Sequence, residues 1–158
     1  MASTDVNSGQ TSQSASALGV DMALEVVTLP VSDVDRAKSF YQRLGWRLDI
    51  DFSPREGVRN LQFTPPHSPC SIQFGKGGTT AQPGSAQGPD TRGKDIDAAR
   101  EDLVSRGVDV SDVQEMKPPG FDAPGRSYFA RASFSDPDGN SWQLQEITTR
   151  LPGREWDD

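Results

Sequence analysis

The stretch that decides the fold is SFSDPDGNSWQLQE, residues 133–146. Its centre, Asp-Pro-Asp-Gly at 136–139, predicts a tight turn, because proline presets φ near about −65° and glycine accepts the positive φ that such turns need. Residues 141–146 then alternate polar and apolar side chains, the period of a strand covered on one face. Ser141, Gln143 and Gln145 therefore project from one face. A concave sheet lining a pocket and a sheet face open to solvent both explain this polar row.

The turn and strand close the second copy of a supersecondary unit that occurs twice, at a spacing of roughly 60 residues. Each copy has a capped amphipathic helix, expected over 36–44 and 95–107 and ending in glycine. The sequence SDVDRAK in the first copy matches KDIDAAR in the second. Strands are expected at 23–29, 46–52, 58–64 and 70–74, then at 108–113, 127–135 and 141–148, with a Pro/Gly loop over 114–126.

The repeat divides the chain into a Ser/Gln/Thr-rich tail expected to be disordered (1–21), a first βαβββ module (22–77), a Gly/Pro-rich linker or degenerate strand (78–94), a second module (95–150) and a C-terminal tail (151–158). Residues 88–94 stand where the second module needs its first strand, yet they contain no apolar residue except Pro89. Burying their charged side chains unpaired would be costly. The segment is therefore either a loop or an edge strand that faces water.

Composition and charge exclude several classes of function. The chain has 158 residues, 33% of them hydrophobic, which is enough for one compact domain. Its net charge of −7 argues against nucleic acid or an anionic membrane as a partner. No apolar run approaches the roughly 18 residues of a membrane span, and the N-terminus does not resemble a secretory signal. With Cys70 as its single cysteine, the chain is expected in a reducing cytoplasm.

Three motifs follow one another in the order of the repeat. LPVSDVDRA at 29–37 leads to Phe-Tyr and Leu-Gly, DIDAA at 95–99 leads to Arg-Gly, and FSDPDGN occupies 134–140. In this order and spacing the chain resembles, over residues 22–150, the vicinal oxygen chelate superfamily of glyoxalases, bleomycin-resistance proteins and ring-cleaving dioxygenases. The resemblance implies an α+β fold of two βαβββ modules. Their strands would form an incomplete barrel, a concave mixed sheet around a cleft, often in a homodimer.

Metalloenzymes of this superfamily hold a divalent metal through His, Glu or Gln on the first and last strand of each module. The resemblance transfers these four positions to Val26, Gln73, Gly88 and Gln143. Valine and glycine side chains offer no donor, and neutral amides are weak ligands of divalent cations. We therefore expect neither the usual metal site nor another cofactor.

The remaining metal-binding or nucleophilic side chains are few. Glu25 and Glu146 are, with the two glutamines, the weak alternative metal ligands; we expect both at strand ends in solvent or paired with arginine. His67, in Pro-Pro-His-Ser-Pro, is expected in an exposed turn. Cys70 is expected to be a small buried apolar residue, because no basic cluster is predicted near its thiol.

The polar row and its neighbours form the expected ligand-binding face. Phe129, Arg131 and Ser133 share one strand face, where Arg131 would suit an anionic or carbonyl-bearing ligand, and a surface arginine explains it equally well. The predicted ligand-binding residues are Thr28, Gln73, Phe129, Arg131, Ser133, Ser141, Gln143 and Gln145.

Three hypotheses for the function follow. The first is a metal-free protein of the bleomycin-resistance type that binds a small molecule in its cleft. The second is an enzyme, a glyoxalase-like lyase or isomerase or a dioxygenase, with a divergent metal site or none. The third is a divergent paralogue that keeps the fold without activity. The first is favoured by the missing ligands and the Gln/Ser row, whereas the second rests on the fold alone.

Overall fold

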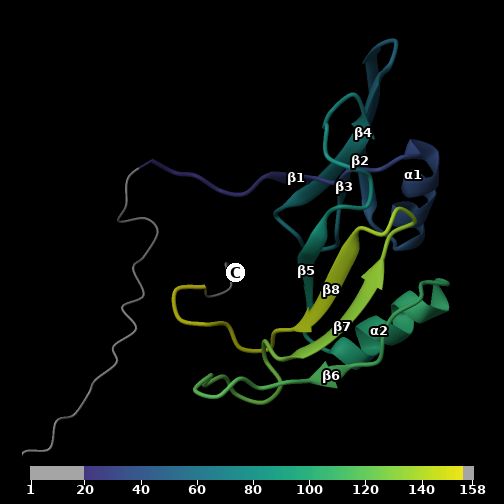
Figure 1. The fold of residues 1–158 in the computed structure, drawn as a ribbon. Coiled ribbons are helices and arrows are strands. Elements are labelled where there is room, and N and C mark those ends of the chain that lie inside the picture. Colours follow the sequence, from purple (N-terminus) through teal and green to yellow (C-terminus); the bar gives the residue numbers. More distant parts are fainter. Residues whose placement is uncertain (1–19, 155–158) are drawn as a thin grey trace, which may run out of the picture.

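The computed structural model describes residues 20–154 (Figure 1). The predicted disordered tail over 1–21 lies almost entirely outside the described residues, as do residues 155–158 of the C-terminal tail. Within the described part, no helix is long and apolar enough to cross a membrane.

The first module runs β-α-β-β-β. Its elements are β1 (Val26–Thr28), α1 (Val34–Arg43), β2 (Arg47–Arg55), β3 (Val58–Thr64) and β4 (Ser71–Lys76). The sheet order is β1-β4-β3-β2, with β1 parallel to β4 and the other pairs antiparallel. Helix α1 begins after Asp33, whose side chain accepts a hydrogen bond from the Arg36 N–H at 3.0 Å. The β2–β3 hairpin extends beyond α1 (Figure 1).

The second module repeats this topology. Its elements are β5 (Gln87–Gly93), α2 (Ile96–Ser105), β6 (Gln114–Glu115), β7 (Ala130–Ser135) and β8 (Ser141–Glu146). The order β5-β8-β7-β6, with β5 parallel to β8, matches that of the first sheet. Asp95 caps α2 as Asp33 caps α1, accepting from the Ala98 N–H at 3.0 Å. The predicted α+β fold of two βαβββ modules is confirmed.

One hydrophobic core joins the two modules. The ring centroid of Tyr41 lies 6.3 Å from that of Trp142, and Phe40 lies 6.5 Å from Phe134, so aromatic side chains of α1 pack on the second sheet. Figure 1 shows α1 beside the first sheet and α2 beside the second, and the opposite face of each sheet carries no helix. We call this the open face.

Residues 88–94 form most of an edge strand, so the second of the two alternatives for this segment is correct. Strand β5 pairs with β8 alone, with Asp90 in register with Gln143 and Arg92 with Gln145. Asp90 and Arg92 are exposed, which spares the cost of burying charge.

The strand predicted over 108–113 is wrong. Val108 and Val110 are buried in the core as their alternation suggests, but no strand forms there. The Arg100 guanidinium donates to the carbonyl oxygens of Ser111 at 2.7 Å and Val110 at 3.3 Å, and so takes two acceptors that a strand ladder would use. The edge strand is instead β6, inside the stretch predicted to be a loop.

Three other predicted strands are shorter than expected, among them the last, which ends at Glu146 rather than at residue 148. Residues 23–25 precede β1 in exposed, irregular chain. Residues 127–129 form a turn before β7, in which the Ala130 N–H donates to the Arg126 carbonyl at 3.1 Å. This turn places Tyr128 at a positive φ of 71°, which matters for the site below.

Candidate ligand-binding site

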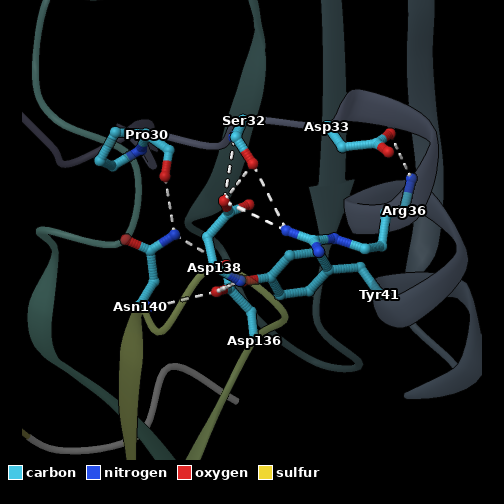
Figure 2. Close-up of polar contacts among 8 residues, drawn as sticks. All are labelled: Pro30, Ser32, Asp33, Arg36, Tyr41, Asp136, Asp138 and Asn140. Atoms are coloured by element: carbon cyan, nitrogen blue, oxygen red, sulfur yellow. Dashed lines mark hydrogen bonds and ion pairs between the residues drawn. The ribbon is translucent and has the colours of Figure 1, made fainter.

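The Asp-Pro-Asp-Gly turn lies at the junction of the modules, with Asp136 and the following Asn140 buried and Pro137 and Gly139 exposed (Figure 2). The Asp136 carboxylate accepts from the Tyr41 hydroxyl at 2.9 Å, from the Asn140 side-chain amide at 2.8 Å, and from the backbone N–H groups of Asp138 and Asn140. The indole of Trp142 in turn donates to the Tyr41 hydroxyl at 3.1 Å. Burial, followed by the charge of Asp136, raises the pKa of Tyr41, so its hydroxyl stays protonated and donates.

A second set of contacts ties the same turn to the start of α1. One Asp138 oxygen accepts from the hydroxyl and backbone N–H of Ser32 and from the Arg36 guanidinium at 3.3 Å. The Asn140 amide also donates to the Pro30 carbonyl at 2.9 Å (Figure 2). We call the side chains of Tyr41, Asp136, Asp138 and Asn140 the clamp. The clamp joins the modules and leaves no acceptor free for a ligand on Asp136, so we assign it a structural role.

The predicted polar row is present on the open face of the second sheet. Register places Gln143 opposite Ser133, and Gln145 opposite Arg131. The Arg131 guanidinium donates to Gln143 Oε1 at 3.0 Å and to the Tyr128 carbonyl at 3.3 Å, and Gln145 Nε2 donates to the same carbonyl at 2.6 Å. Strands β7 and β8 thus bring together four of the predicted ligand-binding residues: Arg131, Ser133, Gln143 and Gln145. Ser141 lies half-buried at the end of the row.

The two predicted residues of the first module form a separate pair. Thr28 is in register with Gln73, and the Gln73 side-chain amide donates to the Thr28 hydroxyl at 2.8 Å. This pair lies on the other sheet and shares no recorded contact with Arg131 or Gln143. Neither of its side chains is charged.

The open face of the second sheet ends in a cavity of about 360 Å³. It lies between β6, the start of β7 and the loop over 116–129, which projects beyond β6 in Figure 1. Mostly apolar side chains line it: Gln114, Met116, Pro118, Phe121, Tyr128, Phe129 and Arg131. A more open hollow of about 400 Å³ lies at the β2–β3 hairpin, but none of the predicted ligand-binding residues lines it. We therefore take the first cavity, called the pocket below, as the candidate site.

Two of the pocket residues, Phe129 and Arg131, were predicted from sequence; the others were not. Met116, Phe121 and Tyr128 lie in a stretch rich in proline and glycine, which has no periodicity that would reveal a facing side chain. An apolar and aromatic cluster inside a Pro/Gly loop was the available signal.

Tyr128 links the pocket to the polar row. Its φ of 71° is unfavourable for a bulky residue, at a cost of roughly 1–3 kcal/mol. Four hydrogen bonds hold it there: its N–H donates to the Glu146 carbonyl at 2.7 Å, its hydroxyl accepts from the Leu151 N–H at 3.1 Å, and its carbonyl accepts from Gln145 and Arg131. The ring lies 6.0 Å from that of Phe121, edge to face. The strained backbone thus orients both a pocket wall and the guanidinium.

The residues at the four expected metal positions do not fit a divalent cation. Val26 and Gly88 provide no side-chain donor, and Gln143 Oε1 already accepts from the cationic guanidinium of Arg131. A second positive charge beside that oxygen would be repelled. Among residues 20–154, no three His, Cys, Asp or Glu side chains gather as a metal site would require.

The alternative ligands are dispersed. Glu25 is exposed, as predicted. The prediction for Glu146 is wrong: its side chain is buried, with 8% of its surface exposed, because its Oε2 accepts the Ile96 N–H at 3.1 Å at the start of α2. His67 is exposed in its turn. Cys70 is half-buried rather than buried, and its thiol faces the Ser71 carbonyl at 3.6 Å.

Comparison with protein families places this fold and its motifs. Residues 23–144 match the model of the Glyoxalase/Bleomycin resistance protein/Dioxygenase superfamily. The chain belongs to this superfamily. No curated protein matches it.

Solved structures of the superfamily align with most of the chain. TnmS3, an antibiotic-binding protein from Streptomyces sp. CB03234, is 32% identical, covers 82% of this chain and 98% of its own, and has a TM-score of 0.65. A glyoxalase/bleomycin resistance protein from the same organism is 33% identical over 78% of this chain and 100% of its own, with a TM-score of 0.62. A superfamily member from Sphaerobacter thermophilus DSM 20745 is 27% identical over 80% and 98%, with a TM-score of 0.64.

Proposed function

We propose that this protein binds a small molecule in the pocket and does so without a metal. The observation that carries the proposal is the pocket itself, about 360 Å³ in volume, with apolar walls and a few polar groups at one side. Pockets of this size and lining are typical of small-ligand sites. The antibiotic-binding relative of 32% identity supports the same class of function.

The misfit of the metal positions supports the metal-free part of the proposal. Where a metal ion would lie, the open face presents the guanidinium of Arg131, which is hydrogen-bonded to Gln143. Enzymatic chemistry through a divalent metal would need ligands that these positions do not provide.

A homodimer belongs to the same proposal. Ile50 and Phe52 lie in register with Gln62 and Asn60, on the face of the first sheet turned away from α1, and are 40% and 61% exposed. Neighbouring exposed apolar side chains mark an interaction surface. We infer that a second copy of the chain covers them.

The test uses phenylnaphthylamine, an uncharged aromatic fluorophore, titrated into protein dialysed against a chelator. Met116→Ala should weaken its binding roughly tenfold, because burying a methionine side chain contributes about 1.5–3 kcal/mol. Met116 is 74% exposed without ligand, so the substitution leaves the fold intact. Met22→Ala is the matched control, since Met22 is 94% exposed and lies ahead of β1, outside the pocket lining.

Four results would contradict the proposal. Absence of binding, or equal weakening by both methionine variants, would show that the pocket is not the site. Loss of binding on chelation, restored by one divalent metal, would favour the enzyme hypothesis. A molar mass of one chain by light scattering, at the concentrations used, would overturn the dimer.

A further inference from the structure

Arg131 differs from most arginines of the described chain in what holds its guanidinium. Six others pair with a carboxylate at 2.5 to 3.3 Å: Arg36, Arg47, Arg59, Arg100, Arg106 and Arg126. Arg131 is held by two neutral acceptors, the Tyr128 carbonyl and the Gln143 side chain. Among residues 20–154, no carboxylate forms a salt bridge with it. Its charge is therefore positioned but not neutralised.

The two acceptors occupy only part of the guanidinium. Within residues 20–154, Nε and Nη1 each donate one hydrogen bond and Nη2 donates none. A guanidinium presents five N–H groups in a planar fork that matches the oxygens of a carboxylate, sulfonate or phosphate. Arg131 itself lines the pocket, beside Tyr128 and Phe129.

One further cation lies beside the pocket lining. Lys117 Nζ lies 5.7 Å from the ring centroid of Phe129, which is a pocket residue. Glu115, the neighbouring carboxylate of β6, is paired with Arg126 at 2.8 Å; Arg126 also pairs with Asp97 at 2.9 Å, so it offsets only part of the Glu115 charge.

Strand β5, on the far side of β8 from Arg131, carries one charge of each sign, Arg92 and Asp90. Arg92 lies on the same cross-strand row as Arg131, with Gln145 between them. Asp90 lies on the next row, in register with Gln143, and is exposed at the sheet edge. Because exposed charges are screened by solvent and salt, Asp90 offsets little of the field at Arg131.

We propose that the ligand of this pocket is an organic acid: an aromatic or otherwise apolar body seated against Phe121, Tyr128 and Phe129, with an anionic group bound by the guanidinium of Arg131. This inference rests on the proposed function, because it assigns the charge of the molecule that the pocket binds. Gln143 and the Tyr128 carbonyl act as positioning groups, since they fix the guanidinium before the ligand arrives.

The experiment compares two probes with the same aromatic body. Phenylnaphthylamine is uncharged, and anilinonaphthalene sulfonate adds one anionic group. Arg131→Gln should weaken binding of the sulfonate about tenfold or more and change binding of the neutral probe by no more than about twofold, because a charge-assisted hydrogen bond is lost for one probe alone. Arg131→Lys, which keeps the charge and loses the fork, should weaken the sulfonate less than Arg131→Gln does.

Arg55→Gln is the matched control, since it removes the same charge from the β2–β3 hairpin, outside the pocket lining. If it weakens the sulfonate as much as Arg131→Gln does, the effect is one of net charge and the inference is overturned. Equal weakening of both probes by Arg131→Gln, or no effect on the sulfonate, would also overturn it. These outcomes would not contradict the proposal that the pocket binds a small molecule. Failure of the neutral probe to bind at all would overturn that proposed function.

Discussion

The two modules build the corresponding turn from different chemistry. Between β3 and β4, the turn over 65–69 makes local hydrogen bonds: the Ser68 hydroxyl accepts from the Cys70 N–H at 3.2 Å and donates to its carbonyl at 2.6 Å. His67 occupies a positive φ of 59° there and is exposed. Between β7 and β8, Asp136 and Asn140 are buried, and their hydrogen bonds reach across the module boundary.

The difference separates the family motif from the site. Asp136 and Asp138 of the Asp-Pro-Asp-Gly turn belong to the clamp, and their side chains bind the other module rather than a ligand. The pocket lies at the other end of β7, in a loop without a motif. Substitutions in the clamp should therefore change stability, whereas substitutions at Arg131 should change ligand binding.

The largest effect is expected from removing the centre of the clamp. Asp136→Ala would leave the Tyr41 hydroxyl, the Asn140 amide and two backbone N–H groups without their acceptor. Buried donors left without an acceptor cost about 1–3 kcal/mol each, so we expect the free energy of unfolding, measured by urea denaturation, to fall by about 3–5 kcal/mol. Asp136→Asn keeps one oxygen and should cost less, which makes the comparison measurable if the alanine variant does not fold.

Ser68→Ala is the control in the first module. It removes only local bonds in a half-buried turn and should cost no more than about 1 kcal/mol. Equal losses for Asp136→Ala and Ser68→Ala would show that the two turns are equivalent after all.

A smaller effect is expected at Gly84 of the linker, which lies against the backbone of Asp138. An added Cβ at Gly84 would lie 2.1 Å from the Asp138 carbonyl oxygen, and the backbone there has φ of +79°. Gly57 has the same φ with nothing within 4 Å of its Cβ position. Gly57→Ala should cost the backbone strain alone, about 1 kcal/mol, and Gly84→Ala about 2–4 kcal/mol by thermal or urea unfolding.

Equal costs for the two alanine variants would mean that the linker moves away from the clamp freely. A cost confined to Gly84→Ala would locate the effect in the contact with Asp138, because both glycines share one backbone conformation.

The smallest effect is expected on the surface. Asp51 of β2 pairs with Lys38 at 2.9 Å and Arg59 at 2.8 Å, and its hydrogen bonds, to Arg59 first and then to Lys38, lower the pKa of its carboxyl. Asp112 of the second module has one longer contact, to Arg100 at 3.3 Å, and its side chain is 96% exposed. Asp51→Asn should cost about 0.5–1 kcal/mol at neutral pH, and Asp112→Asn close to nothing.

The pH dependence gives the sign of this effect. A carboxyl whose pKa is lower in the folded state stabilises the fold above its unfolded pKa of about 4, and the contribution disappears as the pH falls through the folded value. The difference in unfolding free energy between the wild type and Asp51→Asn should therefore be constant from about pH 5 upward and shrink in acid. A difference that grew in acid would exclude the pair as its cause.

Local patterns were enough to predict most elements and their repeat, and the resemblance of the motifs to the superfamily gave the fold. The caps Asp33 and Asp95 are visible in sequence because N-cap preference depends on the few residues that follow. The repeat and the alternation in 141–146 likewise depend on neighbours in the chain, and the buried Trp142 and Leu144 follow the predicted face. The metal positions came from the resemblance to the superfamily, and the expectation that no metal binds remains a prediction.

In two of the wrong predictions, a partner from another element decided the outcome. Arg100 takes carbonyls that a strand over 108–113 would have used, and Glu146 is buried because the first N–H of α2 needs an acceptor. The set of predicted ligand-binding residues stays a prediction, although the structure brings four of them together.

The sequence by itself determined the repeat, the helix caps, the turns and the sheet faces, because these depend on backbone preferences and on the alternation of neighbouring side chains. Only the tertiary structure decided that the Asp-Pro-Asp-Gly turn contributes to the clamp. It also decided that Arg131 lies beside an apolar pocket and bonds to neutral acceptors rather than to a carboxylate. Both depend on which groups from other elements come within hydrogen-bond distance, and no local pattern in the chain contains that information.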